Sequence, residues 1–150
     1  MQYYTITNYG DPEGDLIRKS NQLKYRERFN TLEGRLNKKV FQFFKNRTFH
    51  DYKLFKFELE HGMNGDKYPI NIKILLTSYD LDIWELHFKG VSKLQTNYVE
   101  DSFSSGFEDW IYEELLDVDE NTLSFEVLFA SEASILIHFK NKMLSIRQLK

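Results

Sequence analysis

The chain has 150 residues, of which 41% are apolar and 29% charged, and it contains 24 aromatic side chains and no cysteine. This composition favours a single globular domain over residues 1–150 and excludes a disordered protein, because enough apolar surface is present to offset the chain entropy lost on folding. The lack of cysteine excludes disulfide frameworks, zinc ribbons and thiolate nucleophiles. No leader-like start and no apolar run of about 20 residues is present, so we expect a cytoplasmic protein.

The net charge of −3 conceals two segments of opposite sign. Between Ile17 and Lys56 there are 12 basic and three acidic residues, whereas Val99–Glu126 holds ten acidic residues and no basic one. Three interpretations are open. The two segments neutralise each other inside the molecule, or the acidic segment binds a basic partner, or the basic segment binds an acidic one.

Residues 1–30 carry the weakest structural signals. The range Gln2–Tyr9 alternates loosely and is rich in Tyr and Thr, which favours a strand. A loop composition follows in Gly10–Asp15. The range Asp15–Arg28 holds no clean apolar stripe, and it is either a loosely ordered basic loop or a poor helix.

An amphipathic helix is predicted next, at about residues 31–45 and ending by residue 47. Its apolar stripe has helical spacing and consists of Leu32, Leu36, Val40, Phe43 and Phe44. Asn30 is placed to cap the helix and Glu33 to complete a capping box.

Residues 49–148 change to the period of two that is typical of strands. Alternating runs at 55–59 and 68–76 surround a glycine-rich loop and predict a β-hairpin. Further alternating runs lie at 83–88, 91–98, 123–129, 135–139 and 143–147, and residues 107–116 are compatible with strand or helix, with strand favoured. We therefore predict an α+β domain with an antiparallel sheet of about seven or eight strands and at least one helix packed on it. An open edge of such a sheet could pair two copies of the chain.

Motifs of catalysis are scarce. His50 beside Asp51 could be an oriented base or metal ligand, or the pair could simply form a polar junction in which Asp51 closes a turn. Glu113 and Glu114 could supply paired carboxylates, but neighbouring residues on a strand point to opposite faces. No nucleophile elbow, phosphate loop or dinucleotide fingerprint is present. We predict no catalytic residue, metal site or cofactor, and a small metal-dependent enzyme using His50 and Asp51 stays as an alternative.

A second alternative is nucleic-acid binding through the basic segment 17–56. Aromatic residues are interleaved with its lysines and arginines and could stack on bases: Tyr25, Phe29, Phe41, Phe43 and Phe44. Two of them, Phe43 and Phe44, belong to the apolar stripe of the predicted helix, and the acidic remainder of the chain would repel a polyanion. Attachment of this helix to a membrane surface is a weaker alternative.

Five stretches of the β-rich region carry a resemblance to known proteins: Phe49–Leu54, Trp84–Val91, Tyr112–Glu114, Glu126–Ala130 and Ile135–Phe139. Together they resemble a group of small bacterial β-rich proteins of unknown function, some of them immunity-type proteins of polymorphic toxin systems. The resemblance covers residues 49–147 and not the basic N-terminal third. It implies a cytoplasmic, non-enzymatic protein that binds a partner, and it transfers no catalytic residue.

The favoured hypothesis is a non-catalytic protein-binding module, in its narrower form an immunity-type protein that neutralises a toxin through an acidic surface. Charged groups steer association and aromatic groups supply affinity, so the predicted partner-binding residues are Glu108, Asp109, Trp110, Glu113, Glu114 and Asp117. This hypothesis requires that these side chains face solvent and are not neutralised by the basic residues of the same chain.

Overall fold

The computed structural model describes residues 1–5, 11–101, 103 and 105–150. These residues form two helices and eight antiparallel strands, so the prediction of an α+β fold is confirmed. In chain order the elements are α1 (Pro12–Asn30), α2 (Lys38–Asn46), β1 (Lys53–His61), β2 (Ile70–Thr77), β3 (Ile83–Val91), β4 (Lys93–Asn97), β5 (Trp110–Asp117), β6 (Thr122–Phe129), β7 (Ser134–Lys140) and β8 (Leu144–Gln148).

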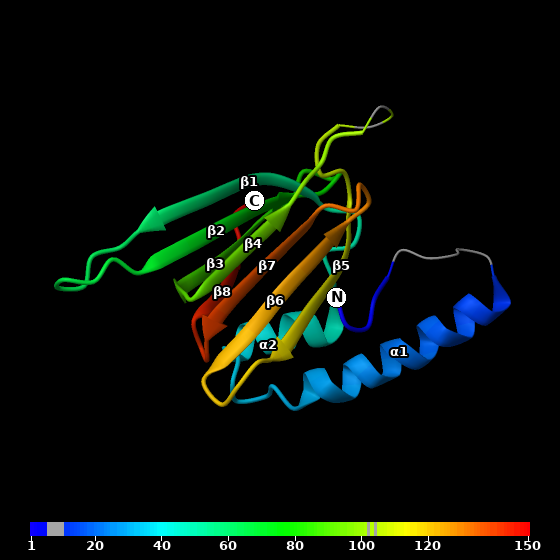
Figure 1. Cartoon of the computed structure of the whole chain (residues 1–150), viewed down its shortest axis with the longest axis horizontal. Coiled ribbons are helices and arrows are strands. Elements are labelled where there is room, and N and C mark those ends of the chain that lie inside the picture. Colours follow the sequence, from blue (N-terminus) through cyan, green and yellow to red (C-terminus); the bar gives the residue numbers. More distant parts are fainter. Residues whose placement is uncertain (6–10, 102, 104) are drawn as a thin grey trace.

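The strands form two four-stranded sheets, ordered β1-β2-β3-β8 and β4-β7-β6-β5. Only Ser92 separates β3 from β4. Two backbone hydrogen bonds of 3.0 Å, from the Ser92 N–H to the His138 carbonyl and from the Lys89 N–H to the Met143 carbonyl, continue the pairing from one sheet to the other. The two sheets are therefore joined along one long bent ribbon, in which β3 and β4 run antiparallel to β8 and β7 (Figure 1).

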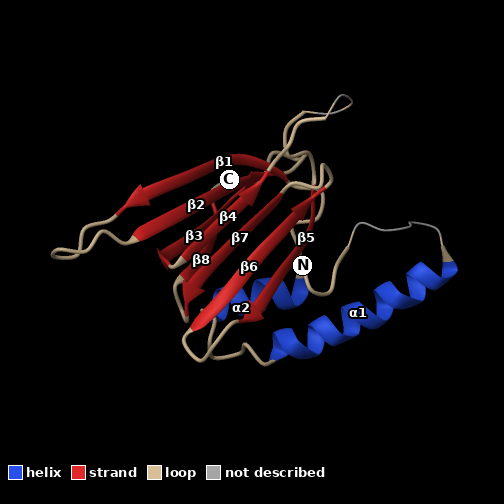
Figure 2. Cartoon of the chain, in the orientation of Figure 1, coloured by secondary structure: helices blue, strands red, loops and turns tan. Residues whose placement is uncertain are grey.

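The core lies between α2 and the face of the sheets that carries the alternating apolar residues (Figure 2). Helix α2 places Phe43 against Phe49 and Trp84, with ring centroids 4.8 and 5.0 Å apart. The two sheets also meet in the core, where the ring centroids of Phe125 on β6 and Phe88 on β3 are 5.2 Å apart. Burying each such side chain contributes about 1.5–3 kcal/mol, so this aromatic cluster is what holds the helix on the sheet.

The predicted helix at 31–45 begins too early. Helix α1 ends at Asn30, with Thr31 as its C-cap, and α2 begins only at Lys38, where the side chain of Asn37 accepts the Lys39 N–H. The reason is Gly34, whose φ of +87° is left-handed and interrupts a right-handed helix. Leu32 and Leu36 are buried as the stripe predicted, but they reach the core from a turn.

The segment that was ambiguous in sequence, 15–28, is helical and belongs to α1. Asp11 caps the helix by accepting the Glu13 N–H at 3.2 Å, and Pro12 occupies a first-turn position that needs no backbone donor. Within α1 only Phe29 is buried, and the N-terminal half extends beyond the sheet (Figure 1). The strand predicted for residues 2–9 is not formed by residues 2–5, and residues 6–9 lie outside the described part.

Candidate interaction surface

Trp110, predicted to be an aromatic contact for a partner, lies in the core. Its side chain is 0% exposed and packs against Phe125 and Phe129, with ring centroids 5.9 and 5.6 Å away. It is the first residue of β5, and its backbone N–H and carbonyl are bonded to Tyr52 and Asp51. The prediction that Trp110 contacts a partner is therefore wrong, because this position on β5 points between the sheets and α2.

Glu113 is also buried, on the same side of β5 as the core. It accepts a hydrogen bond of 2.6 Å from the Trp110 indole N–H. Burial raises the pKa of the Glu113 carboxyl group, while hydrogen bonds from Thr48, Trp110 and the Phe49 backbone oppose that rise. Its acceptor oxygens are thus used to tie β5 to the segment that follows α2, and the carboxylate is not available to a partner.

Glu114 points to the opposite face, as the strand prediction required, and is 1% exposed. It accepts three backbone N–H groups, from Gln2 at 2.9 Å, Tyr3 at 2.7 Å and Tyr4 at 2.9 Å. The N-terminal segment consequently crosses the outer face of β5 and covers Glu114. Placing Glu114 on an open acidic surface was therefore wrong.

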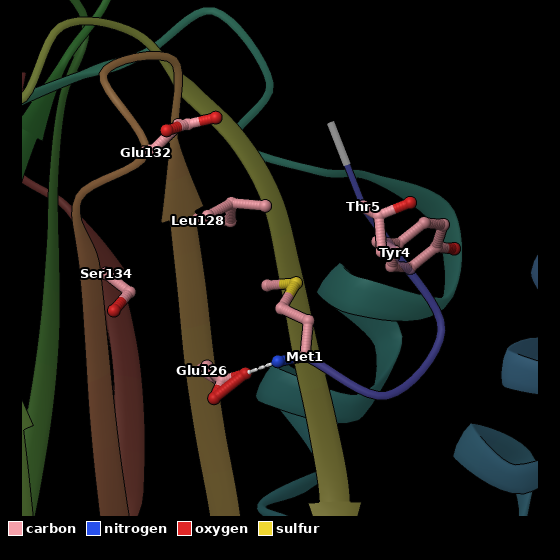
Figure 3. Close-up of a pocket in the computed structure, with 7 residues that line it drawn as sticks. All are labelled: Met1, Tyr4, Thr5, Glu126, Leu128, Glu132 and Ser134. Carbon is pink, nitrogen blue, oxygen red and sulfur yellow. Dashed lines mark ion pairs between the residues drawn. The ribbon is translucent and has the colours of Figure 1, made fainter. Parts of the chain in front are cut away.

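The N-terminal segment is held by two further contacts. The Met1 amino group forms an ion pair with Glu126 (Figure 3). Glu126 lies on β6, directly opposite Glu114 of β5. Tyr4 stacks on Tyr112 with ring centroids 4.7 Å apart and planes at 9°. Burial raises the pKa of the Tyr4 hydroxyl to about 12. Glu126, the last carboxylate of the acidic segment, is thus also paired within the chain.

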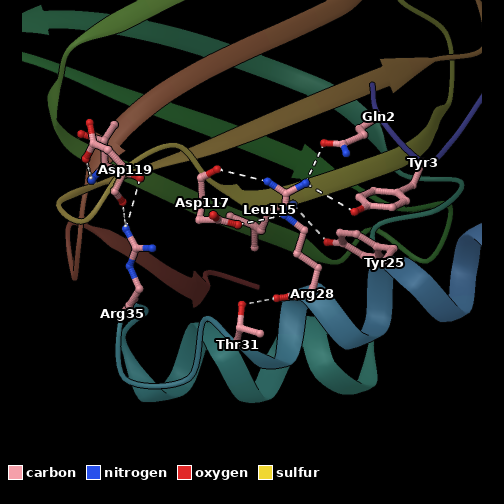
Figure 4. Close-up of polar contacts among 10 residues, drawn as sticks. Gln2, Tyr3, Tyr25, Arg28, Thr31, Arg35, Leu115, Asp117 and Asp119 are labelled. Atoms are coloured by element: carbon pink, nitrogen blue, oxygen red, sulfur yellow. Dashed lines mark hydrogen bonds and ion pairs between the residues drawn. The ribbon is translucent and has the colours of Figure 1, made fainter.

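Asp117, at the end of β5, is paired with a basic residue of α1. Its carboxylate accepts the Arg28 Nε–H at 2.9 Å, and Arg28 also donates to the side chain of Gln2 at 2.7 Å (Figure 4). The hydrogen bond from Arg28 holds the pKa of Asp117 below its usual value. Nearby, Arg35 donates to the backbone carbonyls of Asp119 and Thr122.

Part of the acidic segment is bound by the basic segment of the same chain, as the first interpretation of the charge pattern expects. Arg28 and Arg35 come from the basic segment, and their acceptors lie in 117–122. Asp109 is likewise near a basic side chain, with its Oδ1 3.7 Å from the Lys53 Nζ. Two carboxylates of the acidic segment, Asp109 and Asp117, are therefore paired with basic side chains of residues 17–56, and Arg35 binds backbone carbonyls of the β5–β6 turn.

Two parts of the acidic segment lie on the surface: the β5–β6 turn, with Asp119 and Glu120, and the β4–β5 connection. We name as the acidic loop six described residues of that connection: Tyr98, Val99, Glu100, Asp101, Phe103 and Glu108. Phe103 is 98% exposed, Val99 and Glu100 are exposed, and Glu108 is half-buried with a left-handed φ of +63°. Of the six predicted partner-binding residues, Glu108 alone belongs to this loop. For the four carboxylates among the others the sequence signal was charge, which does not distinguish paired from unpaired carboxylates.

His50 and Asp51 lie at the junction between α2 and β1. The His50 Nδ1 lies 3.0 Å from the Asp51 Oδ1, and the Asp51 N–H donates to the Trp110 carbonyl at 2.9 Å. Asp51 has a φ of +69°, which fits a residue that closes a turn between two elements. Among the described residues there is no cluster of three or more His, Asp or Glu side chains that could hold a metal ion.

One pocket lies beside the N-terminal segment and another beside His50. The first, of about 350 Å³, opens on the outer face of β6 and β7 beside Leu128, Glu132 and Ser134 (Figure 3). The second, of about 170 Å³, lies between α1 and β5 and includes His50 and Glu113. In the first, Glu126 is paired with the Met1 amino group, and in the second, Glu113 accepts the Trp110 indole N–H.

The aromatic residues that could have stacked on nucleic-acid bases are mostly in the core. Phe29, Phe41, Phe43 and Phe44 are all buried. The fifth, Tyr25, is partly buried and its hydroxyl accepts the Leu115 N–H at 3.0 Å. Stacking on bases from these positions is therefore blocked by the protein itself.

No protein-family model, curated protein sequence or solved structure matches this chain. The resemblance to immunity-type proteins thus stays a prediction. No helix in the described part of the chain has the length and apolar character needed to cross a membrane.

Proposed function

We propose that the chain is a non-catalytic protein-binding module that uses the acidic loop to bind a basic protein surface. The observation that carries this proposal is the side chain of Phe103, 98% exposed among the carboxylates of Glu100, Asp101 and Glu108. A fully exposed aromatic ring gains by burial against a partner, and such rings are enriched among the residues that supply binding energy.

Charge complementarity identifies the class of partner. The acidic loop carries three carboxylates and no basic residue, and one of them, Asp101, accepts the Phe103 N–H at 2.8 Å. Like-signed charge on a surface raises the association rate with a partner of opposite sign and repels others. In the narrower form of this proposal, the partner is a basic toxin or nuclease and the chain is its immunity protein.

The test measures binding of the purified chain to the purified basic products of the genes adjacent to its own, by biolayer interferometry at low and high salt. The double variant E100K/E108K should lower the association rate at least about 10-fold at low salt, with less effect at high salt. F103A should raise Kd at least about fivefold, mainly through faster dissociation.

The matched control is E27K/E33K, which makes the same change of charge at exposed positions on α1 and in the turn before α2. This control should bind as the wild type does. Two results would contradict the proposal: equal binding by the acidic-loop variants and the wild type, or no binding of any such basic product to the wild-type chain.

A further inference from the structure

The two sheets have four edge strands, and β1 differs from the other three. Strands β4 and β8 have only five residues each. Strand β5 is shielded by α1, because the Leu115 N–H is bonded to Tyr25 and the Asp117 carbonyl accepts from Arg28. Strand β1 has nine residues, and along its outer side the described residues supply one isolated bridge, between Lys53 and Asp109 (Figure 2).

Large apolar side chains lie on this open edge. Phe55 is 63% exposed and Leu59 is 44% exposed, and Phe57 between them is only half-buried. Leu59 lies opposite Ile72 and Phe57 opposite Ile74, both of which are in the core, so the two β1 residues continue the apolar face of the sheet beyond its covered part. Long edge strands with exposed apolar residues are templates for pairing with another strand.

The sequence of β1 is complementary to itself when two copies run antiparallel. With Phe57 opposite its own copy, Lys56 faces Glu58 of the second copy, and the reverse pair is formed by symmetry. Phe55 lies at the irregularity between Leu54 and Lys56, where the register of β1 with β2 shifts, so it is left out of this pairing, and the apolar cross-strand pair is Phe57 with its own copy. Both kinds of cross-strand pair, opposite charges and apolar side chains, stabilise a sheet.

Neighbouring registers lack this complementarity. Directly opposite residues must lie on the same face, so the next symmetric registers are centred on Lys56 or on Glu58. The first places two lysines opposite each other and the second places two glutamates opposite each other. Repulsion at the symmetry axis disfavours both, which leaves the register centred on Phe57.

We propose that β1 pairs antiparallel with β1 of a second copy of this chain, with the two-fold axis at Phe57. The result is a continuous sheet of eight strands, four from each copy. Within one chain the Lys56 Nζ lies 2.6 Å from the Glu58 Oε1. In the dimer the ion pairs of the two copies lie side by side, and each lysine has a glutamate of its own chain and one of the other chain as neighbours. A single strand edge is a small interface, and we expect a dimer that depends on protein concentration.

The test is sedimentation velocity between about 5 and 500 μM. The wild type should shift from the mass of one 18.0 kDa chain toward twice that mass as its concentration rises. K56E places two glutamates opposite each other at each charge pair and E58K places two lysines there, so each variant alone should stay monomeric. An equimolar mixture of K56E and E58K should dimerise, because every cross-strand charge pair then joins opposite signs.

The double variant K56E/E58K should dimerise like the wild type, and E33K, in the exposed turn before α2, should have no effect. Circular dichroism of each variant verifies that it is folded. A wild type that is monomeric throughout, single variants that dimerise like the wild type, or a mixture that stays monomeric would each overturn the proposal. The acidic-loop variants leave β1 intact, so this result is independent of the binding test above.

Discussion

At the scale of single residues, buried carboxylates hold segments together that are far apart in sequence. Glu114 satisfies three backbone donors of residues 2–4, which otherwise have no sheet to pair with. Glu113 does the same for the segment after α2 and for the Trp110 indole. Leaving a buried donor without its acceptor costs more free energy than leaving an exposed one, so these two side chains contribute more to stability than exposed carboxyl groups do.

The substitution E114Q tests this role. Glutamine presents one acceptor oxygen and an NH₂ group that would face N–H donors, so at least one of the three donors loses its partner. We expect the free energy of unfolding to fall by about 2–3 kcal/mol, measured by urea denaturation at neutral pH. The control E120Q changes an exposed carboxylate in the β5–β6 turn and should stay within about 0.5 kcal/mol of the wild type. Equal stability of the two variants would contradict the assignment.

At the scale of elements, α1 is attached to the body mainly by polar contacts along β5. Tyr25 and Arg28 both reach the edge of this strand, and Phe29 alone among the α1 residues is buried (Figure 4). Burial raises the pKa of the Tyr25 hydroxyl, which therefore stays protonated at neutral pH and accepts the Leu115 N–H. Helix α1 thus covers the outer edge of β5, whereas no described residue covers most of the outer edge of β1.

The substitution Y25F removes that acceptor and keeps the ring. We expect the Leu115 amide to exchange with solvent deuterium markedly faster than in the wild type, because its N–H no longer has a protein partner. The loss of one hydrogen bond should lower stability by about 1 kcal/mol. Hydrogen exchange followed by NMR provides its own control in the Phe125 amide of β6, which has strands on both sides. Unchanged exchange at Leu115 would refute the contact.

At the scale of the whole molecule, the segregated charges of the chain attract each other across the fold. The pKa of Asp117 is held below its ordinary value of 3.8, chiefly by the hydrogen bond from Arg28, and that of Asp119 is also lowered, chiefly by the Asn121 backbone. A carboxyl group with a lowered pKa in the folded state stabilises the fold above its ordinary pKa. That stabilisation is lost as the pH falls through the folded-state value.

The variant D117N should therefore be less stable than the wild type at pH 7, and its stability should decline less between pH 5 and pH 2. Because Asp117 is partly exposed, the difference is expected to be modest and to shrink at high salt. Urea denaturation across this pH range measures the effect. D66N, in the exposed β1–β2 loop, should leave the pH dependence as it is in the wild type, and an equal flattening by both variants would count against the Arg28–Asp117 contact.

Local patterns predicted much of the fold. The period-two runs identified the strands of the β-rich region, including β5, which had been compatible with a helix, and the glycine-rich loop at 62–66 does join β1 to β2. The helical stripe identified the core residues of α2 but not its start, since the left-handed φ of Gly34 does not show in a hydrophobic pattern. Helix α1 was missed as a definite element because its apolar residues follow no stripe.

Alternation and composition by themselves determined that this chain forms an α+β domain with antiparallel strands, and that Glu113 and Glu114 occupy opposite faces of β5. Only the tertiary structure decided which carboxylates remain on the surface. The partners of Glu114 and Asp117 lie about 110 and 89 positions away along the chain, and no local pattern encodes contacts at such separations. Charge in a sequence is a local property, whereas its neutralisation depends on which distant segments the packed sheets bring together.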